Sequence, residues 1–483
     1  MFDDLRQFIA RVSELGELKQ IDGADWDLEI GAITEIEAES PDARLLLFQN
    51  IKGYPPGFRV ASNLFNTSRR IALAFGLPLH LSGTALVRAM KERIDKGITL
   101  IPPVYVTSGP VTENVFTGDD VDIMKFPSPR WHKDDGGRYI GTNGIVITRD
   151  PDAGWVNFAP QRVQVHDRNT AAIFMATGRH NDIIRRKYWA QGKSCPVAVS
   201  CGQEPLLFAA GDWPVTWGTS EYDFAGGLKG TPIKVIKGIT TDLPLPATAE
   251  IVLEGELLPP GAGSVIEGPF GEWPGYYAGG ARPETIFRVN SLLHRNQPII
   301  QGGRAIVNPA GWTLGRHIWR AALVWHELER QIPGVTGVWV VGEAGINSMI
   351  VASIRQMYPG HAKQTVELLS CLQATALNLS YAIIVDEDID PSNMSELIWA
   401  LGTRTDPAES IDILHHTRAT PAHPMISPEK RDRSDYTHST AQIIACRPYH
   451  WKDKFPKPAK SSSADLKATR EKWAQLWESV RGG

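Results

Sequence analysis

The stretch WVNFAPQRVQVHD, residues 155–167, decides the fold of the middle of this chain. It contains two short runs rich in apolar and β-branched residues, 154–158 and 163–166, and this pattern predicts two strands joined by a turn. Runs of the same kind recur between residues 139 and 304, at 145–148, 196–200, 232–236, 251–257 and 286–289. One helix, expected at 181–191, interrupts them. Closely spaced short strands with few helices predict a β-barrel or β-sandwich core.

The segments on both sides of this core mix helices and strands. Before it, the pattern predicts strands at 45–48 and 59–61 and helices at 5–15, 28–36, 68–76 and 83–95, the first capped by Asp3 or Asp4 and ended by Gly16. After it, we expect helices at 315–331 and 365–376, strands at 337–341 and 381–385, and a largely irregular region at 403–460. A tail helix then carries one apolar face, made of Leu466, Trp473, Leu476, Trp477 and Val480.

The expected fold class is therefore α+β and α/β in a multidomain chain. We predict an N-terminal α/β domain over residues 1–110 and a β-rich central domain over 111–311. A C-terminal α/β domain would cover 312–460, followed by a C-terminal helix at 461–483. The length of 483 residues allows two to three domains of ordinary size.

The composition excludes several classes of protein. Lys and Arg total 50 against 54 Asp and Glu, and no basic run is longer than residues 185–187, which argues against a nucleic-acid binder. No apolar stretch approaches the ~18 residues of a transmembrane helix, and the acidic start MFDDLRQFI does not resemble a signal peptide. Four cysteines without a CxxC pair predict no disulfide framework, so we expect a cytoplasmic protein.

Polar residues of the β-rich segment are the first candidates for chemistry. Asn157, His180 and Glu221 would together offer oxygen and nitrogen ligands, which suit Mn²⁺ or Mg²⁺ with phosphate oxygens completing the shell. Taken singly, they also fit a strand-edge amide, a core histidine and a surface-loop acid. The chain contains no Walker loop, no dinucleotide GxGxxG after a strand, no GxSxG and no HExxH, so the commonest cofactor and hydrolase classes lose weight.

The second candidate is a pair of acids around a tight turn. Glu267 and Glu272 flank Gly-Pro-Phe-Gly in the segment IEGPFGEWPGYY, residues 266–277. Burial would raise the pKa of one acid and make it a proton donor. An arginine able to pair with only one acid would keep the second one ionised. The alternative is a solvent-exposed turn with two unrelated acids. Two weaker candidates are Lys363, at a loop–helix junction suited to a phosphate or simply at a helix start, and His423, in a Pro-rich loop that faces either a pocket or solvent.

Four segments together resemble the UbiD family of decarboxylases over nearly the whole chain. They are WVNFAPQRVQVHD, IEGPFGEWPGYY, PGHAKQ at 359–364 and LGTRTDP at 401–407. The resemblance implies a three-part subunit whose central domain is a flavin-binding split β-barrel. It also implies a prenylated flavin mononucleotide (prFMN), a divalent metal, usually Mn²⁺, that bridges the cofactor phosphate, and a nearby K⁺.

The same resemblance assigns roles to individual residues. It makes Asn157, His180 and Glu221 the metal ligands and Arg162, Glu267 and Glu272 the catalytic set, with Arg162 holding the carboxylate and Glu272 delivering the proton. The implied K⁺ residues are Ala210, Gly211, Trp213, Glu221 and Arg404. The implied cofactor-binding residues are Asn157, Phe158, Ala159, Gln161, Arg162, Arg179, His180 and Glu221. A lysine that some relatives use for the phosphate has no match here, and we take Lys363 in its place. From the sequence itself, the amide of Asn308 and the loop that carries His423 are assigned to the substrate.

We therefore expect a reversible non-oxidative decarboxylase of an aromatic, heteroaromatic or α,β-unsaturated carboxylic acid. The alternatives are a polyprenyl 4-hydroxybenzoate decarboxylase of quinone synthesis, a non-catalytic flavin-binding scaffold of the same fold, and a metal hydrolase. A flavin prenyltransferase would supply the cofactor. The apolar face of the tail helix predicts a homo-oligomer, either a dimer or a hexamer.

Overall fold

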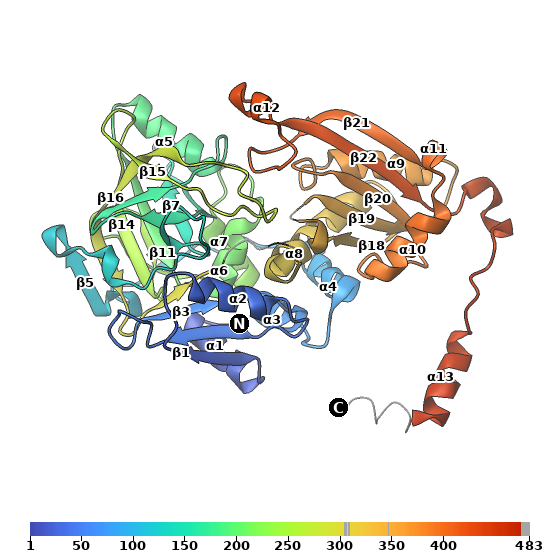
Figure 1. Ribbon diagram of the computed structural model, residues 1–483, viewed down its shortest axis with the longest axis horizontal. Helices are drawn as coiled ribbons and strands as arrows, with labels where there is room; N and C mark the ends of the chain where they lie inside the picture. Colours follow the sequence, from blue (N-terminus) through green and yellow to red (C-terminus); the bar gives the residue numbers. More distant parts are fainter. Residues whose placement is uncertain (304–306, 308–309, 346, 475–483) are drawn as a thin grey trace.

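A computed structural model describes residues 1–303, 307, 310–345 and 347–474. Figure 1 shows the N-terminal and central parts together on one side of the molecule and the C-terminal sheet on the other, with α8 (Ala310–Glu329) and α4 (Gly83–Asp95) between them. Among the described helices, none combines the length and apolar character that crossing a membrane requires.

The N-terminal sheet has four strands in the order β1-β2-β3-β17. The strands are β1 (Leu18–Asp22), β2 (Leu45–Gln49), β3 (Arg59–Ser62) and β17 (Ile299–Gln301), accompanied by α1 (Leu5–Glu14), α2 (Glu29–Ala38) and α3 (Ser68–Ala74). Helix α1 begins where Asp4 accepts a hydrogen bond from the backbone of Gln7, as its position in the sequence predicts. Strand β17 lies parallel to β3, so the chain returns to this sheet far beyond residue 110, where the predicted N-terminal domain ends.

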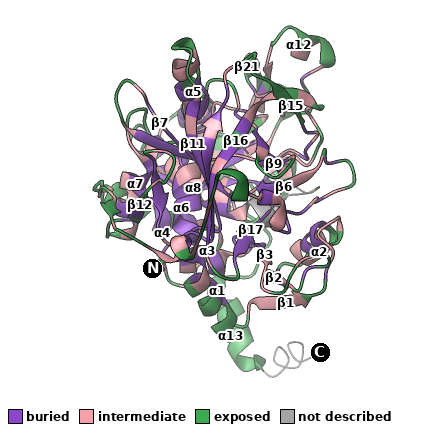
Figure 2. Cartoon of the chain, turned by 90° about the vertical axis from the view of Figure 1, so that its left-hand side faces the viewer, coloured by how far each residue is buried: buried purple, intermediate pink, exposed green. Residues whose placement is uncertain are grey.

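The central part is a ten-stranded sheet whose main path runs β6-β9-β10-β16-β14-β11-β7-β8, with β15 and β5 paired to β16. Over the described residues this path is open and does not close into a barrel. The strands are β5 (Asn114–Thr117), β6 (Arg138–Gly141), β7 (Ile145–Arg149), β8 (Val156–Pro160), β9 (Val163–Val165), β10 (Thr170–Ile173), β11 (Cys195–Cys201), β14 (Ile251–Leu257), β15 (Ser264–Glu267) and β16 (Arg282–His294). The buried residues of these strands form the interior, which is purple in Figure 2.

Three helices and a small sheet complete the central part. They are α5 (His180–Ala190), α6 (Pro205–Asp212) and α7 (Glu221–Lys229), with the sheet β13 (Pro244–Pro246), β12 (Lys234–Lys237) and β4 (Val104–Tyr105). Glu221 is the first residue of α7 and only 4% exposed, which contradicts the alternative of a surface-loop acid. The preceding Ser220 caps this helix by accepting a hydrogen bond from the backbone of Tyr222.

The C-terminal sheet has the order β18-β19-β20-β22-β21. Its strands are β18 (Val335–Val340), β19 (Met349–Ile354), β20 (Tyr381–Asp386), β21 (Ile411–Arg418) and β22 (Thr437–Ala445), with α9 (His361–Cys371), α10 (Met394–Arg404), α11 (Pro407–Ser410) and α12 (Pro428–Asp432). The expectation that 403–460 is irregular was wrong, because β22 pairs with both β20 and β21. Its alternation of polar and apolar residues is weak locally, and the neighbouring strands supply the missing stabilisation.

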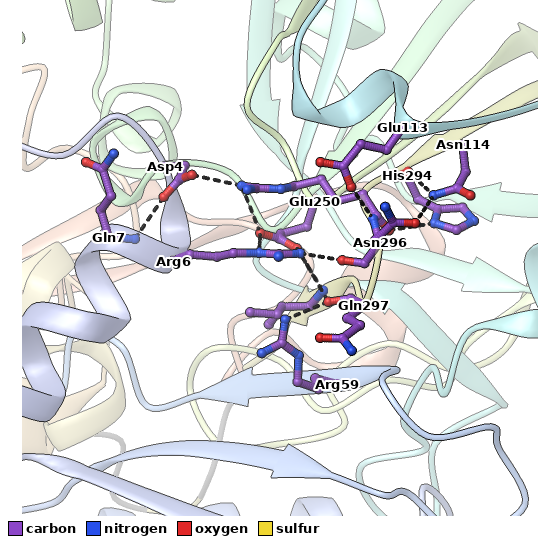
Figure 3. Close-up of polar contacts among 12 residues, drawn as sticks. Asp4, Arg6, Gln7, Arg59, Glu113, Asn114, Glu250, His294, Asn296 and Gln297 are labelled. Atoms are coloured by element: carbon purple, nitrogen blue, oxygen red, sulfur yellow. Dashed lines mark hydrogen bonds and ion pairs between the residues drawn. The ribbon is translucent and has the colours of Figure 1, made fainter.

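Side-chain contacts connect the three parts. Arg6 on α1 donates through Nε and Nη2 to the fully buried Glu250 at 2.8 Å each, and Arg295 donates to Asp4 at 2.8 Å (Figure 3). On the other side, α4 packs on α8, where the Arg88 guanidinium lies 4.6 Å from the ring centre of Trp325. The N-terminal segment therefore contacts both other parts of the molecule.

The tail helix α13 (Ser463–Lys472) is exposed along its whole length. Figure 1 shows it apart from the rest of the fold. Of its predicted apolar face, Leu466 is 47% exposed and Trp473 is 50% exposed, whereas Leu476, Trp477 and Val480 lie outside the described residues.

Candidate active site

The structure brings together the three side chains expected to bind a metal. Asn157 comes from β8, His180 begins α5, and Glu221 begins α7. Asn157 Oδ1 lies 3.1 Å from Nδ1 of His180, and the same end of the Asn157 amide lies 3.2 Å from Oε1 of Glu221. Neighbouring ligands of an octahedral cation with bonds of about 2.1 Å are about 3 Å apart. The spacing of these atoms therefore suits a small divalent cation.

Electrostatics at these residues also fit a cation. Burial raises the pKa of the Glu221 carboxyl to about 8, although the Phe158 backbone donates to its Oε2 at 2.8 Å. Burial lowers the pKa of His180, and the neighbouring Arg179 adds to this effect, so the imidazole is neutral as a metal ligand must be. A bound cation would compensate the cost of a buried carboxylate at Glu221.

The ligand side chains are held by a further polar layer. Asn181, the residue after His180, accepts hydrogen bonds from Asn157 Nδ2 and from Thr148 Oγ1, the latter at 2.8 Å, and donates to the carbonyl of Val146 at 3.1 Å. Thr148 and Asn157 are cross-strand partners in the pairing of β7 with β8. Asn181 was not predicted from the sequence, although its place beside the candidate His180 is a signal that could have identified it.

The second cluster joins the expected arginine and its two acids. Arg162, between β8 and β9, donates from Nε to Glu267 Oε1 at 2.6 Å and from Nη2 to Glu267 Oε2 at 2.9 Å. Its Nη1 donates to Glu272 Oε1. The expectation that Arg162 pairs with only one acid was therefore wrong, because the planar guanidinium presents separate nitrogens to the two carboxylates.

The surroundings of this cluster explain its rigidity. Glu267 is fully buried at the end of β15, and the Tyr139 hydroxyl lies 3.4 Å from its Oε1. Gln164, two residues after Arg162 on β9, accepts from the backbone of Gly268 at 2.9 Å. The two acids raise the pKa of the Arg162 guanidinium despite its burial, so it remains charged. Gln164 and Tyr139 were not singled out from the sequence, although Gln164 lies on the strand that follows Arg162.

Asp135 supports the segment that carries Glu272. It is 6% exposed, and its Oδ1 accepts a hydrogen bond from the Tyr277 hydroxyl at 2.8 Å. Burial raises the pKa of the Asp135 carboxyl to about 6, while Tyr277 and the Gly271 backbone oppose this shift. Burial thus disfavours the ionised form, which predominates only above about pH 6.

Asp135→Asn should become more stable relative to the wild type as the pH rises from 4 to 8. Because the pKa of Asp135 is 3.8 in its ordinary state and about 6 when folded, the wild type is most stable below pH 4 and loses up to about 3 kcal/mol between about pH 4 and pH 6, with little further change above. Asparagine does not titrate and should show no such loss. Urea unfolding at several pH values measures the difference, with the exposed neighbour variant Asp134→Asn as the control. A pH-independent difference for Asp135→Asn would contradict the expectation.

The proposed K⁺ residues are only partly assembled. Ala210 and Gly211 lie on α6, where Gly211 faces Phe158 and a Cβ at this position would come within 3.0 Å of its ring, and Trp213 follows the helix. Arg404, in contrast, ends α10 in the C-terminal part and donates to Asp386 Oδ2 at 2.9 Å and to Asp388 Oδ1 at 2.8 Å. Its described bonds are thus to these two carboxylates rather than to Glu221, and its assignment to the K⁺ site stays a prediction.

Lys363 and His423 also lie apart from the two clusters. Lys363, on α9, is partly exposed and its Nζ donates to Asp412 Oδ2 at 2.8 Å, while its assignment to the cofactor phosphate stays a prediction. The ring of His423 packs 4.5 Å from that of His438 and its Nε2 lies 3.4 Å from the Ser380 hydroxyl. Asn308 lies outside the described residues.

The remaining candidate cofactor residues lie on or next to the Asn157 strand. The Phe158 ring is fully buried 4.8 Å from that of Tyr222, and Ala159 pairs with Val146 in the sheet. Arg179 is exposed and immediately precedes His180. Gln161 has a buried Oε1 that lacks a hydrogen-bond partner among the described residues, so a hydrogen-bond donor of a bound group would be stabilised beside Arg162. This unsatisfied acceptor between the clusters fits a polar cofactor ring.

Comparisons with protein-family models match most of the chain. The model described as the 3-octaprenyl-4-hydroxybenzoate carboxy-lyase N-terminal domain matches residues 9–90. The Rift-related domain of the same carboxy-lyase matches residues 104–307, and its C-terminal domain matches residues 314–444.

Individual proteins agree with these models. Pyrrole-2-carboxylic acid decarboxylase of Pseudomonas aeruginosa is 33% identical over 450 residues, which cover 89% of this chain and 88% of that protein. The open form of vanillic acid decarboxylase from Sedimentibacter hydroxybenzoicus superposes with a TM-score of 0.82 at 27% identity, over 99% of both chains. The UbiD-class enzyme HmfF from Pelotomaculum thermopropionicum, in complex with FMN, has a TM-score of 0.84 at 26% identity over 96% of this chain and 98% of its own. Because the family models follow one another along most of the sequence, the chain belongs to the UbiD family of carboxy-lyases.

Proposed function

We propose that this chain catalyses the reversible non-oxidative decarboxylation of an aromatic or heteroaromatic carboxylic acid with prFMN. The observation that carries the proposal is the guanidinium of Arg162, which joins Glu267 and Glu272. Loss of CO₂ from an sp² carbon leaves an electron pair without an internal acceptor, and prFMN supplies that acceptor when bound. An α,β-unsaturated acid meets the same chemical requirement.

The contacts suggest how Arg162 binds the substrate. Glu267 occupies Nε and Nη2 in a bidentate pair, while Glu272 bonds only through Nη1 and is the more accessible of the two acids, with 15% of its side chain exposed. A substrate carboxylate would take the place of Glu272 at Nη1, because this bond is single and the other pair is buried. Glu267 would keep the guanidinium oriented throughout.

Release from Arg162 would leave Glu272 free to hold and move a proton. In the decarboxylation direction the C–C bond breaks, CO₂ departs, and the proton of the Glu272 carboxyl forms the new C–H bond. In the carboxylation direction Glu272 would accept the proton that leaves the same carbon. The two acids thus have different roles because they bond different nitrogens of Arg162.

The donor set of the first cluster would hold the metal. We assign Asn157, His180 and Glu221 to Mn²⁺ or Mg²⁺, supported by their mutual spacing and by the oxygen and nitrogen donors they offer. The cofactor phosphate would complete the coordination, and backbone carbonyls near Ala210 and Trp213 would supply a K⁺ site. The central sheet would then form the flavin-binding split barrel, with Gln161 and Arg162 among the residues that would hold the cofactor.

The function is tested by screening carboxylic acids for CO₂ release. The protein would be produced together with a flavin prenyltransferase, and the screen would include pyrrole, furan, hydroxybenzoate and acrylic-type acids. We expect release from at least one aromatic or heteroaromatic acid, and none from protein produced without the prenyltransferase. If the flavin-loaded protein released CO₂ from none of these acids, the proposed function would be wrong.

The chain is also proposed to form a homo-oligomer. The exposed face of α13 includes Leu466 and Trp473, and such an apolar face is stabilised when another surface covers it. Light scattering at micromolar concentration should therefore give the mass of at least a dimer. Deletion of residues 461–483 should lower the number of subunits in the particle. A monomer for the full chain would contradict this prediction.

A further inference from the structure

The segment that carries Glu272 is fastened on two sides. This segment, residues 268–281 between β15 and β16, is called the Glu272 segment below. On one side the Tyr277 hydroxyl donates to Asp135 at 2.8 Å, and on the other side Arg431 Nη1 donates to the carbonyl of Ala278 at 2.6 Å. The two anchored residues are consecutive, although their partners lie in the central and C-terminal parts of the molecule.

The anchor in the central part is closely packed. Asp135 is buried and its Oδ2 accepts from the backbone of His132 at 2.9 Å, while the adjacent Gly136 donates its N–H to the carbonyl of Pro269 at 2.7 Å. A Cβ at Gly136 would lie 2.0 Å from the carbonyl oxygen of Gly268, so only glycine permits this approach. The start of the Glu272 segment therefore rests directly on residues 135 and 136.

The anchor in the C-terminal part is equally well defined. Arg431, on α12, donates from Nε to the carbonyl of Ile426 and from Nη2 to that of His423, both at 2.9 Å. These bonds orient its Nη1 toward Ala278. The C-terminal part is thus joined to the Glu272 segment through the Arg431 guanidinium.

Backbone bonds transmit these anchors to Glu272. Its N–H donates to the carbonyl of Tyr276 at 2.9 Å, and its carbonyl accepts from Gly275 at 2.8 Å. Glu272 is therefore part of a closed turn that ends one residue before Tyr277. A shift of Tyr277 or Ala278 must move this turn and, with it, the carboxyl group that reaches Arg162.

We propose that Arg431 and the Asp135–Tyr277 pair are positioning residues that keep the Glu272 carboxyl within reach of a substrate bound at Arg162, so that proton delivery depends on the C-terminal part being seated against the Glu272 segment. The inference rests on the proposed function, in which Glu272 is the proton donor. Proton transfer tolerates little displacement, and an error of about 1 Å in a reacting group can cost about 100-fold in rate. Neither anchor contacts Arg162 or Glu267 directly in the contacts described above, so substrate binding should depend on them much less.

The test uses Tyr277→Phe and Arg431→Gln, each with a matched control. Tyr276→Phe is the control for the first, because Tyr276 is 61% exposed and joins the turn through its carbonyl. Arg433→Gln is the control for the second. Arg433 directly follows α12, and its side chain donates to the carbonyl of Glu429 on that helix at 3.3 Å. The flavin-loaded variants would be assayed for kcat and KM on an acid that the wild type decarboxylates.

We expect kcat to fall by roughly ten- to a hundredfold in Tyr277→Phe and Arg431→Gln, with KM within about threefold of the wild type. Hydrogen–deuterium exchange of the Glu272 segment should be faster in both variants, with and without cofactor, and unchanged in both controls. Unchanged kcat and unchanged exchange in both variants would overturn the inference, as would a rise in KM with kcat retained. Because the exchange is measured without turnover, faster exchange in protein that decarboxylates no acid would reject the proposed function and retain the fastening of the segment.

Discussion

Glu272→Gln should lower turnover by roughly 10²–10⁴-fold while the flavin remains bound, which is the range for losing a positioned general acid. Glutamine has nearly the same shape, and its amide oxygen can still accept the hydrogen bond that Arg162 Nη1 now donates to Glu272. It cannot release a proton to carbon. The measurement is solvent-deuterium incorporation into product and exchange into substrate analogues, with flavin occupancy followed by absorbance.

Glu267→Gln is the informative comparison for this variant. Glu267 is fully buried and bonds two nitrogens of Arg162, so its change to glutamine leaves a buried guanidinium without its main counter-charge. We expect a higher KM and a lower unfolding temperature in addition to slower turnover. If Glu272→Gln bound the flavin and exchanged deuterium at the wild-type rate, the role assigned to Glu272 would be wrong.

His180→Ala should weaken Mn²⁺ binding by at least roughly 100-fold. Nδ1 of His180 lies 3.1 Å from the Asn157 amide, and the same end of that amide lies 3.2 Å from Oε1 of Glu221, so the ring is one of three neighbouring donors. Losing a ligand costs more affinity than the ~10–100-fold typical of residues that only support ligands. Titration with Mn²⁺, followed by electron paramagnetic resonance, measures the affinity directly. The fold should persist, because His180 is the first residue of α5 and is only half-buried.

His166→Ala provides the control for the metal prediction. His166 follows β9 in the same sheet but makes no contact with Asn157 or Glu221 in the contacts described above. Its removal should leave Mn²⁺ affinity within about threefold of the wild type. Equal affinity in the two histidine variants would show that His180 is not a ligand.

Local patterns predicted most helices and many strands of this fold. The alternation in residues 154–166 corresponds to β8 and β9, and Asp4 and Gly16 bracket α1 as their positions indicated. Strands β21 and β22 were missed, because their stability depends on pairing with each other and with β20 rather than on their own residues. The helical position of Glu221 was missed because Gly226 and Gly227 weaken the local helix pattern of α7.

The sequence alone determined the kinds of group in the candidate site and their order along the chain. The spacing of Glu267 and Glu272 around a short turn, and the place of Arg162 just after Asn157, are properties of neighbouring residues. Only the tertiary structure decided that Arg162 bonds both acids. It also decided that Arg404 and Lys363 pair with carboxylates elsewhere. The contacts of Asp135 and Arg431 with the Glu272 segment likewise come from the tertiary structure alone. The reason is physical: each of these contacts joins residues far apart in the chain, and their distances follow from the packing of whole sheets and helices rather than from local backbone preference.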